Sequence, residues 1–165
     1  MRLALLLLSL AALPAPAAQA APGPTYAGVK LDDERRVLVV LPSGQAFVFS
    51  GRAMCEDPKL ASDKRTVGYL VLRRIPPSAD SIPTTEVSEE LRIHVPGAGI
   101  RKIVPGGYIR AWSFSSDGRR VAVYSGGLHF AGFYVLYDVA TGRDVQLAQD
   151  PVTERSPAWV RALSR

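Results

Sequence analysis

Short apolar runs with a period of two residues dominate this chain and constrain its fold more than any other feature. In residues 108–114, 119–124 and 133–139, aliphatic and aromatic side chains alternate with polar ones or form β-branched runs. This alternation is typical of β-strands, and no helical spacing extends beyond about two turns. Further candidate strands are residues 36–41, 45–49, 66–72, 91–95, 100–104 and 145–148. We therefore predict an all-β fold.

Prolines and glycines stand mainly between these runs, where turns require them. Residues 42–44 (Pro-Ser-Gly) predict a hairpin between the runs 36–41 and 45–49. Residues 75–86 differ, because they contain three prolines and no periodicity. Loops of this length are uncommon in compact domains, and they are often functional or disordered. We interpret this proline-rich segment as an insertion on the surface.

A short pattern opens three of the predicted strands: an acidic residue, then basic residues, then a valine. It occurs at residues 33–37, 62–67 and 116–121. After the last two occurrences, the order of strands and turns is also similar, which indicates an internal repeat over residues 62–104 and 108–149. The first copy is longer by about the length of the proline-rich segment.

The acidic residues of these patterns fit turns better than catalysis. Gly118 tolerates a positive φ, and the carboxylate of Asp117 can accept backbone N–H bonds across the turn. Asp138 and Gly142 repeat the arrangement, as a turn followed by a bulge. We therefore interpret Asp117, Gly118, Asp138 and Gly142 as structural turn residues.

At these residues the chain resembles the WD40-like repeats of TolB-type β-propellers. Residues 112–118 (Trp-Ser-Phe-Ser-Ser-Asp-Gly) are similar to the Trp-Ser-Pro-Asp-Gly signature of that family, and residues 138–142 are similar to its Asp-x-x-Thr-Gly turn. Residues 156–159 (Ser-Pro-Ala-Trp) look like the start of another unit. The chain departs from the pattern at Ser116, where the family has proline, and at His94, which replaces the acid of the first copy.

The resemblance implies blade-like sheets, but the chain is too short for a closed standard propeller. A blade takes roughly 40–45 residues, and closed propellers typically have four to eight blades. We expect about three propeller-blade-like antiparallel β-sheets or a twisted β-meander. The chain also resembles small exported bacterial proteins of unknown function, and that similarity implies no activity.

The first 20 residues read as a secretory signal peptide. Arg2 precedes an apolar run over residues 3–13, and residues 18–20 (Ala-Gln-Ala) form a small-x-small cleavage site. The run is shorter than the roughly 20 residues that span a membrane. We expect cleavage after residue 20, a flexible lead over residues 21–27, and a single all-β domain over residues 28–165. The expected location is the periplasm or the exterior, with no membrane span after cleavage.

The distribution of charge and the spacing of cysteine and histidine residues argue against nucleic-acid binding and metal binding. The formal net charge is +5, but the basic residues are scattered, whereas nucleic-acid binders concentrate them on one face. Cys55 is alone, so we expect a buried thiol, with a bridge between chains as the alternative. His94 and His129 have no metal-ligand spacing. We expect no nucleic acid, no metal and no cofactor.

The best candidate for a functional loop is residues 125–132, between two predicted strands. Three glycines permit close backbone approach, and Leu128, His129 and Phe130 stand among them. If exposed, Leu128 and Phe130 would anchor a partner, and we take all three residues as the candidate binding residues. In the alternative, the two apolar side chains pack into the core while His129 forms local hydrogen bonds.

These observations predict an exported, non-catalytic binding or structural module of the bacterial cell envelope. The expected partner is an envelope protein or a second copy of the chain. A small hydrolase or ligand-binding protein centred on His129 is the alternative, although no nucleophile elbow or phosphate loop accompanies that residue. A long uncovered strand edge would favour self-association.

Overall fold

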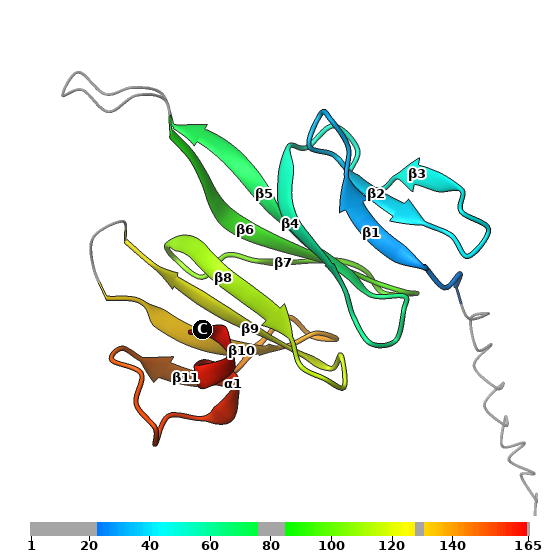
Figure 1. Ribbon diagram of the computed structural model, residues 1–165. Helices are drawn as coiled ribbons and strands as arrows, with labels where there is room; N and C mark the ends of the chain where they lie inside the picture. Colours follow the sequence, from blue (N-terminus) through cyan, green and yellow to red (C-terminus); the bar gives the residue numbers. More distant parts are fainter. Residues whose placement is uncertain (1–22, 76–84, 128–130, 165) are drawn as a thin grey trace, which may run out of the picture.

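The computed structural model describes residues 23–75, 85–127 and 131–164. It is all-β, as predicted, with three antiparallel sheets and one short helix (Figure 1). Sheet A contains β1 (Gly28–Leu31), β2 (Val37–Val40) and β3 (Ala46–Val48). Sheet B contains β4 (Cys55–Leu60), β5 (Val67–Ile75), β6 (Thr85–Val95) and β7 (Gly99–Ile103). Sheet C contains β8 (Tyr108–Phe114), β9 (Arg120–Gly126), β10 (Phe133–Asp138) and β11 (Asp144–Gln149).

Each sheet is a meander in which every strand pairs with the next one along the chain. The predicted hairpin is β2–β3, in which Leu38 pairs with Val48. The three acid-to-valine patterns occupy equivalent positions in the three sheets, because each leads into the second strand of its sheet. The valines that end them, Val37, Val67 and Val121, are all fully buried. Within the described residues, the three sheets form no closed barrel.

Three elements lack a sequence signal strong enough to predict them. β4 has the sequence Cys-Glu-Asp-Pro-Lys-Leu, which does not alternate, and its pairing with β5 is irregular between Glu56 and Lys59. β1 is only four residues long. The helix α1 (Ala158–Leu163) is less than two turns long. β5 and β6 are also longer than predicted, because they pair as far as Ile75 and Thr85.

Several sequence predictions concern residues outside the described ranges. These are the signal segment 1–20 and most of the proline-rich segment 75–86, of which residues 76–84 are not described. Of the expected lead 21–27, Tyr26 is described and buried, and its N–H donates to the carbonyl of Lys64 at 2.7 Å. No helix in the described ranges is long and apolar enough to span a membrane.

Sheet B lies between the other two sheets and contributes to two hydrophobic clusters. Its side chains alternate along β5, so that Val67 and Tyr69 pack with Val37 and Val39 of sheet A. Leu70 instead packs with Val121 and other residues of sheet C. The period-two patterning of β5 therefore places apolar side chains on both faces of the central sheet.

Trp112 of β8 packs directly on the backbone of β5. It is 1% exposed, and its ring meets the ring of Phe114 edge to face, with the centroids 5.3 Å apart. A Cβ atom at Gly68 would lie 2.6 Å from Cη2 of Trp112, a distance that real Cβ atoms do not reach. Gly68 is therefore required for sheet C to approach sheet B at this point.

We predict that Gly68→Ala lowers the free energy of unfolding by about 1–3 kcal/mol, because the added methyl group displaces the Trp112 ring. Gly28→Ala is the matched control, because a Cβ at Gly28 meets nothing within 4 Å. Urea denaturation measures both. Equal stability of the two variants would show that Trp112 does not need the space above Gly68.

His94 of β6 lies at the boundary between sheets A and B. Its ring meets the ring of Phe49 edge to face, with the centroids 4.7 Å apart. Its Nδ1 atom is buried and has no hydrogen-bond partner among the described residues. Burial lowers the pKa of His94, because the charged imidazolium would lose its hydration there.

We predict that stability falls on mild acidification because of His94. Its pKa is lower in the folded chain than the roughly 6.5 of an unfolded chain. Below about pH 6.5 the unfolded state therefore binds the proton more readily, and the free energy of unfolding decreases. Chemical denaturation at about pH 7.5 and about pH 5.5 measures this loss. His94→Phe should reduce it, and an unchanged loss in that variant would contradict the assignment.

Candidate functional site

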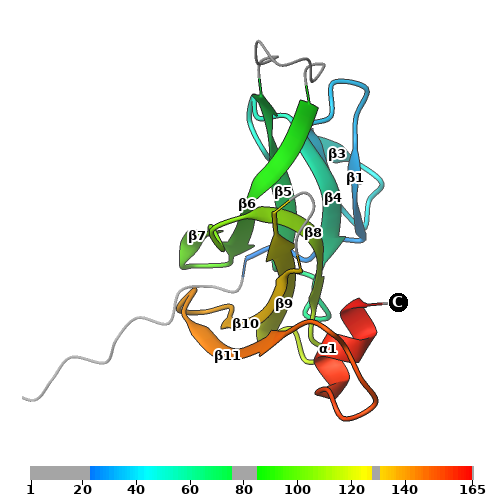
Figure 2. The ribbon, with the colours of Figure 1, turned by 90° about the vertical axis from the view of Figure 1, so that its left-hand side faces the viewer.

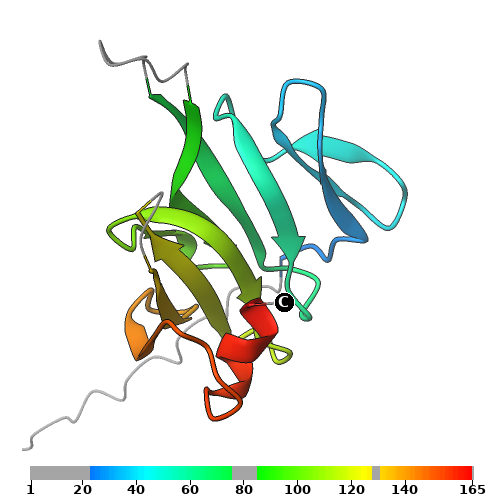
Figure 3. The same ribbon diagram turned by 60° about the vertical axis from the view of Figure 1, so that its left-hand side comes forward.

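The end of β8 and the turn after it separate two cavities. This part, residues 113–116 (Ser-Phe-Ser-Ser), is called here the serine segment. It lines a cavity of about 270 Å³ beside α1 and a cavity of about 380 Å³ beside β4. Figure 3 shows the helix, the end of β8 and the end of β4 side by side. The two cavities lie on either side of the pattern that resembles the WD40-like signature.

The helix-side cavity is mainly apolar. Its walls are Trp159 and Leu163 of α1, Leu136 and Ala122 of sheet C, and the serine segment. The Nε1 atom of Trp159 donates to Oε1 of Gln146 at 3.0 Å, which fixes the indole over the sheet. Apolar walls with a few hydroxyl groups are typical of sites that bind a ligand or a partner side chain.

The β4-side cavity has the same serine segment as one wall and residues 58–62 as another, with Val29 of β1 beside them. Lys59 is its cationic group. The Nζ atom lies 2.8 Å from Oδ2 of Asp57, donates to the carbonyl of Trp112, and lies 4.6 Å from the centre of a Trp112 ring. Lys59 therefore already has an anionic partner.

The turn residues of the β8–β9 connection anchor this segment. Oδ1 of Asp117 accepts the N–H of Arg119 at 3.0 Å and the hydroxyl of Ser115 at 2.6 Å. The bond from Ser115, together with that from Arg119, holds the pKa of Asp117 below its usual value. Gly118 has a φ of 69°, and a Cβ there would lie 3.1 Å from Oγ of Ser62.

The β4–β5 turn is built in the same way. Oδ1 of Asp63 accepts the N–H groups of Arg65 and Thr66 at 2.9 Å each. Lys64 stands where the other turn has Gly118, and its φ is also positive at 57°. The two turns thus share their backbone conformation, and the close approach of Ser62 to Gly118 places them beside each other.

Asp138 and Gly142 form the turn between β10 and β11. Oδ1 of Asp138 accepts both the N–H and the hydroxyl of Thr141 at 2.8 Å, and these bonds lower the pKa of Asp138. The N–H of Gly142, with a φ of 71°, donates to the carbonyl of Asp138 at 2.8 Å. Asp117 and Asp138 are therefore both hydrogen-bonded within their own turns.

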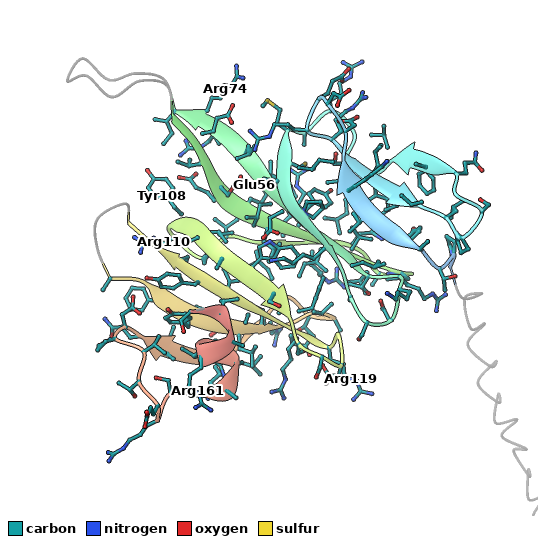
Figure 4. All side chains as sticks on the ribbon, in the orientation of Figure 1. Glu56, Arg74, Tyr108, Arg110, Arg119 and Arg161 are labelled. Carbon is teal, nitrogen blue, oxygen red and sulfur yellow. The ribbon has the colours of Figure 1, made fainter. Side chains whose placement is uncertain are left out.

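Leu128, His129 and Phe130, the candidate binding residues, lie outside the described residues. The two ends of their loop are described. Arg110 donates to the carbonyl of Gly127, and the carboxylate of Asp150 accepts the N–H of Gly132 at 3.0 Å. Figure 4 shows Arg110 at the opposite end of sheet C from Arg119 in the β8–β9 turn. The described ends of the loop thus lie away from the two cavities.

The residues at the base of that loop form a polar and aromatic cluster. The hydroxyl of Tyr124 donates to Oδ2 of Asp150 at 2.7 Å, and Nη1 of Arg110 donates to the same hydroxyl at 3.0 Å. The rings of Tyr124 and Tyr134 stack, with their centroids 4.3 Å apart. Burial and the charge of Asp150 raise the pKa of Tyr134 to about 12, while the bonds from Gly132 and Tyr124 lower the pKa of Asp150.

Metal-ligating side chains are not brought together in the parts of the chain that the structure describes. No three His, Cys, Asp or Glu side chains there are placed to hold a metal ion. Cys55 is fully buried, its thiol donates to the carbonyl of Ala53 at 3.3 Å, and burial raises its pKa. Such a thiol is not positioned to bridge two chains.

Sequence reasoning missed the helix-side cavity because it missed α1. The sequence predicts that residues 156–159 begin another repeat unit, but Trp159 lies in the first turn of the helix. Helical spacing of Trp159, Val160 and Leu163 after Pro157 is the signal that indicates this helix. Val160 is fully buried, which ties the helix to the sheet.

No protein-family model matches the chain, and a search of curated proteins gives no significant match.

Proposed function

We propose that this protein is a non-catalytic binding module exported to the bacterial cell envelope, and that the serine segment is the centre of its binding surface. One observation carries the proposal: two adjoining cavities share this segment as a wall. Apolar surface from α1 and β4 surrounds a row of hydroxyl groups there. Such a surface fits a partner that inserts apolar side chains and forms hydrogen bonds to the serines.

The polar groups of these cavities favour binding over catalysis. The hydroxyl of Ser115 donates to Asp117 and accepts the N–H of Arg120 at 3.0 Å, so it stabilises the turn. Lys59 is held by Asp57 and by the carbonyl of Trp112. Both groups are thus engaged in structural hydrogen bonds, and the lowered pKa of Asp117 makes it a weak general base for Ser115 near neutral pH.

Two further parts of the proposal rest on the sequence. The assignment to the envelope follows from the signal-like residues 1–20. A WD40-like origin is supported by the shared geometry of the Asp63 and Asp117 turns, each of which precedes the second strand of a four-stranded meander. We propose that sheets B and C are two copies of one ancestral unit.

Affinity capture with surface variants tests the binding function. Ser116 is exposed and lines both cavities, so a tryptophan at this position fills the binding surface without entering the core. We predict that Ser116→Trp lowers capture of partners from an envelope extract by at least about tenfold, as expected for a central interface residue. Quantitative mass spectrometry measures the loss, and the melting temperature should stay unchanged.

Gln45→Trp, at the exposed turn between β2 and β3, is the matched control and should capture partners as the unmodified protein does. The double variant Leu128→Ser with Phe130→Ser tests the loop at residues 125–132 as the alternative binding surface. Loss of capture in this double variant, with Ser116→Trp unaffected, would move the binding surface to the loop and contradict the role of the serine segment. Equal loss in Ser116→Trp and Gln45→Trp would also contradict it.

A further inference from the structure

The strand β11 is an open edge of sheet C. It pairs on one side with β10, and residues 144–149 make no backbone hydrogen bond outside the sheet within the described ranges. Alternate N–H and C=O groups of an edge strand point away from the sheet and can pair with another strand. Figure 2 shows β11 at the rim of the molecule.

The side chains of β11 add apolar surface to this edge. Val145 is 54% exposed and Leu147 is 66% exposed. Leu147 pairs with Val135, so it lies on the same face as Phe133, which is 44% exposed. The helix α1 packs mainly over β8 and β9 and reaches β11 through the bond from Trp159 to Gln146. The three apolar side chains are thus left uncovered.

Other edges of the described sheets carry features that oppose pairing with another chain. β7 contains Arg101 and Lys102, β4 contains Pro58, and β3 is only three residues long. Lysine, arginine, proline and short length are the usual protections of an edge strand. β11, with the sequence Asp-Val-Gln-Leu-Ala-Gln, has six residues and no lysine, arginine or proline; its pairing with β10 is irregular only at Val145, which has no partner there.

We propose that β11 pairs antiparallel with β11 of a second copy of this chain. A two-fold axis at Gln146 places Val145 opposite Leu147 of the second copy, and Leu147 opposite Val145 of the second copy. The same register places Asp144 opposite Ala148 of the second copy, so the charged residues do not face each other. The exposed strand is therefore complementary to itself, which is the requirement for a symmetric dimer.

This dimer does not depend on the proposed binding surface, which lies at the other edge of sheet C on the serine segment of β8. Pairing of one six-residue strand buries less area than the roughly 1,200–2,000 Å² of a stable interface. We therefore expect a dimer that forms at micromolar concentrations and dissociates on dilution.

Sedimentation velocity from about 5 µM to about 500 µM tests the proposal. The unmodified protein should shift from monomer to dimer, and Leu147→Lys should raise the dissociation constant at least about tenfold, because it places a charge against Val145 of the second copy. Val104→Lys is the matched control: Val104 is 64% exposed and lies just after β7. It should dimerise as the unmodified protein does.

A cysteine cross-link tests the register and does not depend on the stability of Leu147→Lys. In the proposed dimer residue 146 faces its own counterpart, so Gln146→Cys should form a disulfide between chains on mild oxidation, since directly opposite strand residues fit disulfide geometry. Val104→Cys should cross-link much less. A monomer at every concentration, a Leu147→Lys variant that dimerises normally, or equal cross-linking of the two cysteine variants would overturn the proposal.

Discussion

The packing of Trp112 on the backbone of Gly68 determines how the central sheet meets its C-terminal neighbour. A tryptophan ring can lie this close to a strand only where the strand has no side chain. The same tryptophan accepts a hydrogen bond from Lys59 at its carbonyl and lies beneath the Lys59 ammonium group. One residue of β8 therefore joins the face of β5 to the edge of β4, and it fixes the position of the serine segment that follows it.

The acidic residues illustrate how this chain uses charge. Asp117, Asp138 and Asp150 accept hydrogen bonds from side-chain hydroxyl groups and from backbone N–H groups, and these bonds lower their pKa values. Carboxylates engaged in this way stabilise turns and loop ends, and they are poorly suited to exchange protons with a substrate near neutral pH. In the described residues these three carboxylates are thus engaged in holding two turns and a loop end.

Much of this architecture could be predicted from the sequence, because period-two patterning and turn residues are local signals. The hairpin β2–β3, the strands around Trp112 and Val121, and the equivalence of the Asp63 and Asp117 turns all follow from them. β4 could not be predicted, since its residues alternate poorly and its pairing depends on β5.

The candidate site was predicted less well, for a physical reason. The cavities form where α1, β4 and the end of β8 meet, and contacts between distant segments leave no pattern in any one of them. The loop with Leu128, His129 and Phe130 is a candidate from the sequence because its composition is unusual. The serine segment resembles ordinary turn sequence, and its position between two cavities becomes visible only in three dimensions.

The central claim is that sheets B and C form one cooperative scaffold, joined at Trp112, that holds the serine segment in place. Hydrogen exchange measured residue by residue along β5 and β9, in increasing denaturant, tests it most directly. The account predicts that the slowest amides of both strands exchange with the same opening free energy, equal to that of global unfolding. Exchange of the β9 amides at a clearly lower opening free energy, while β5 stays protected, would contradict it.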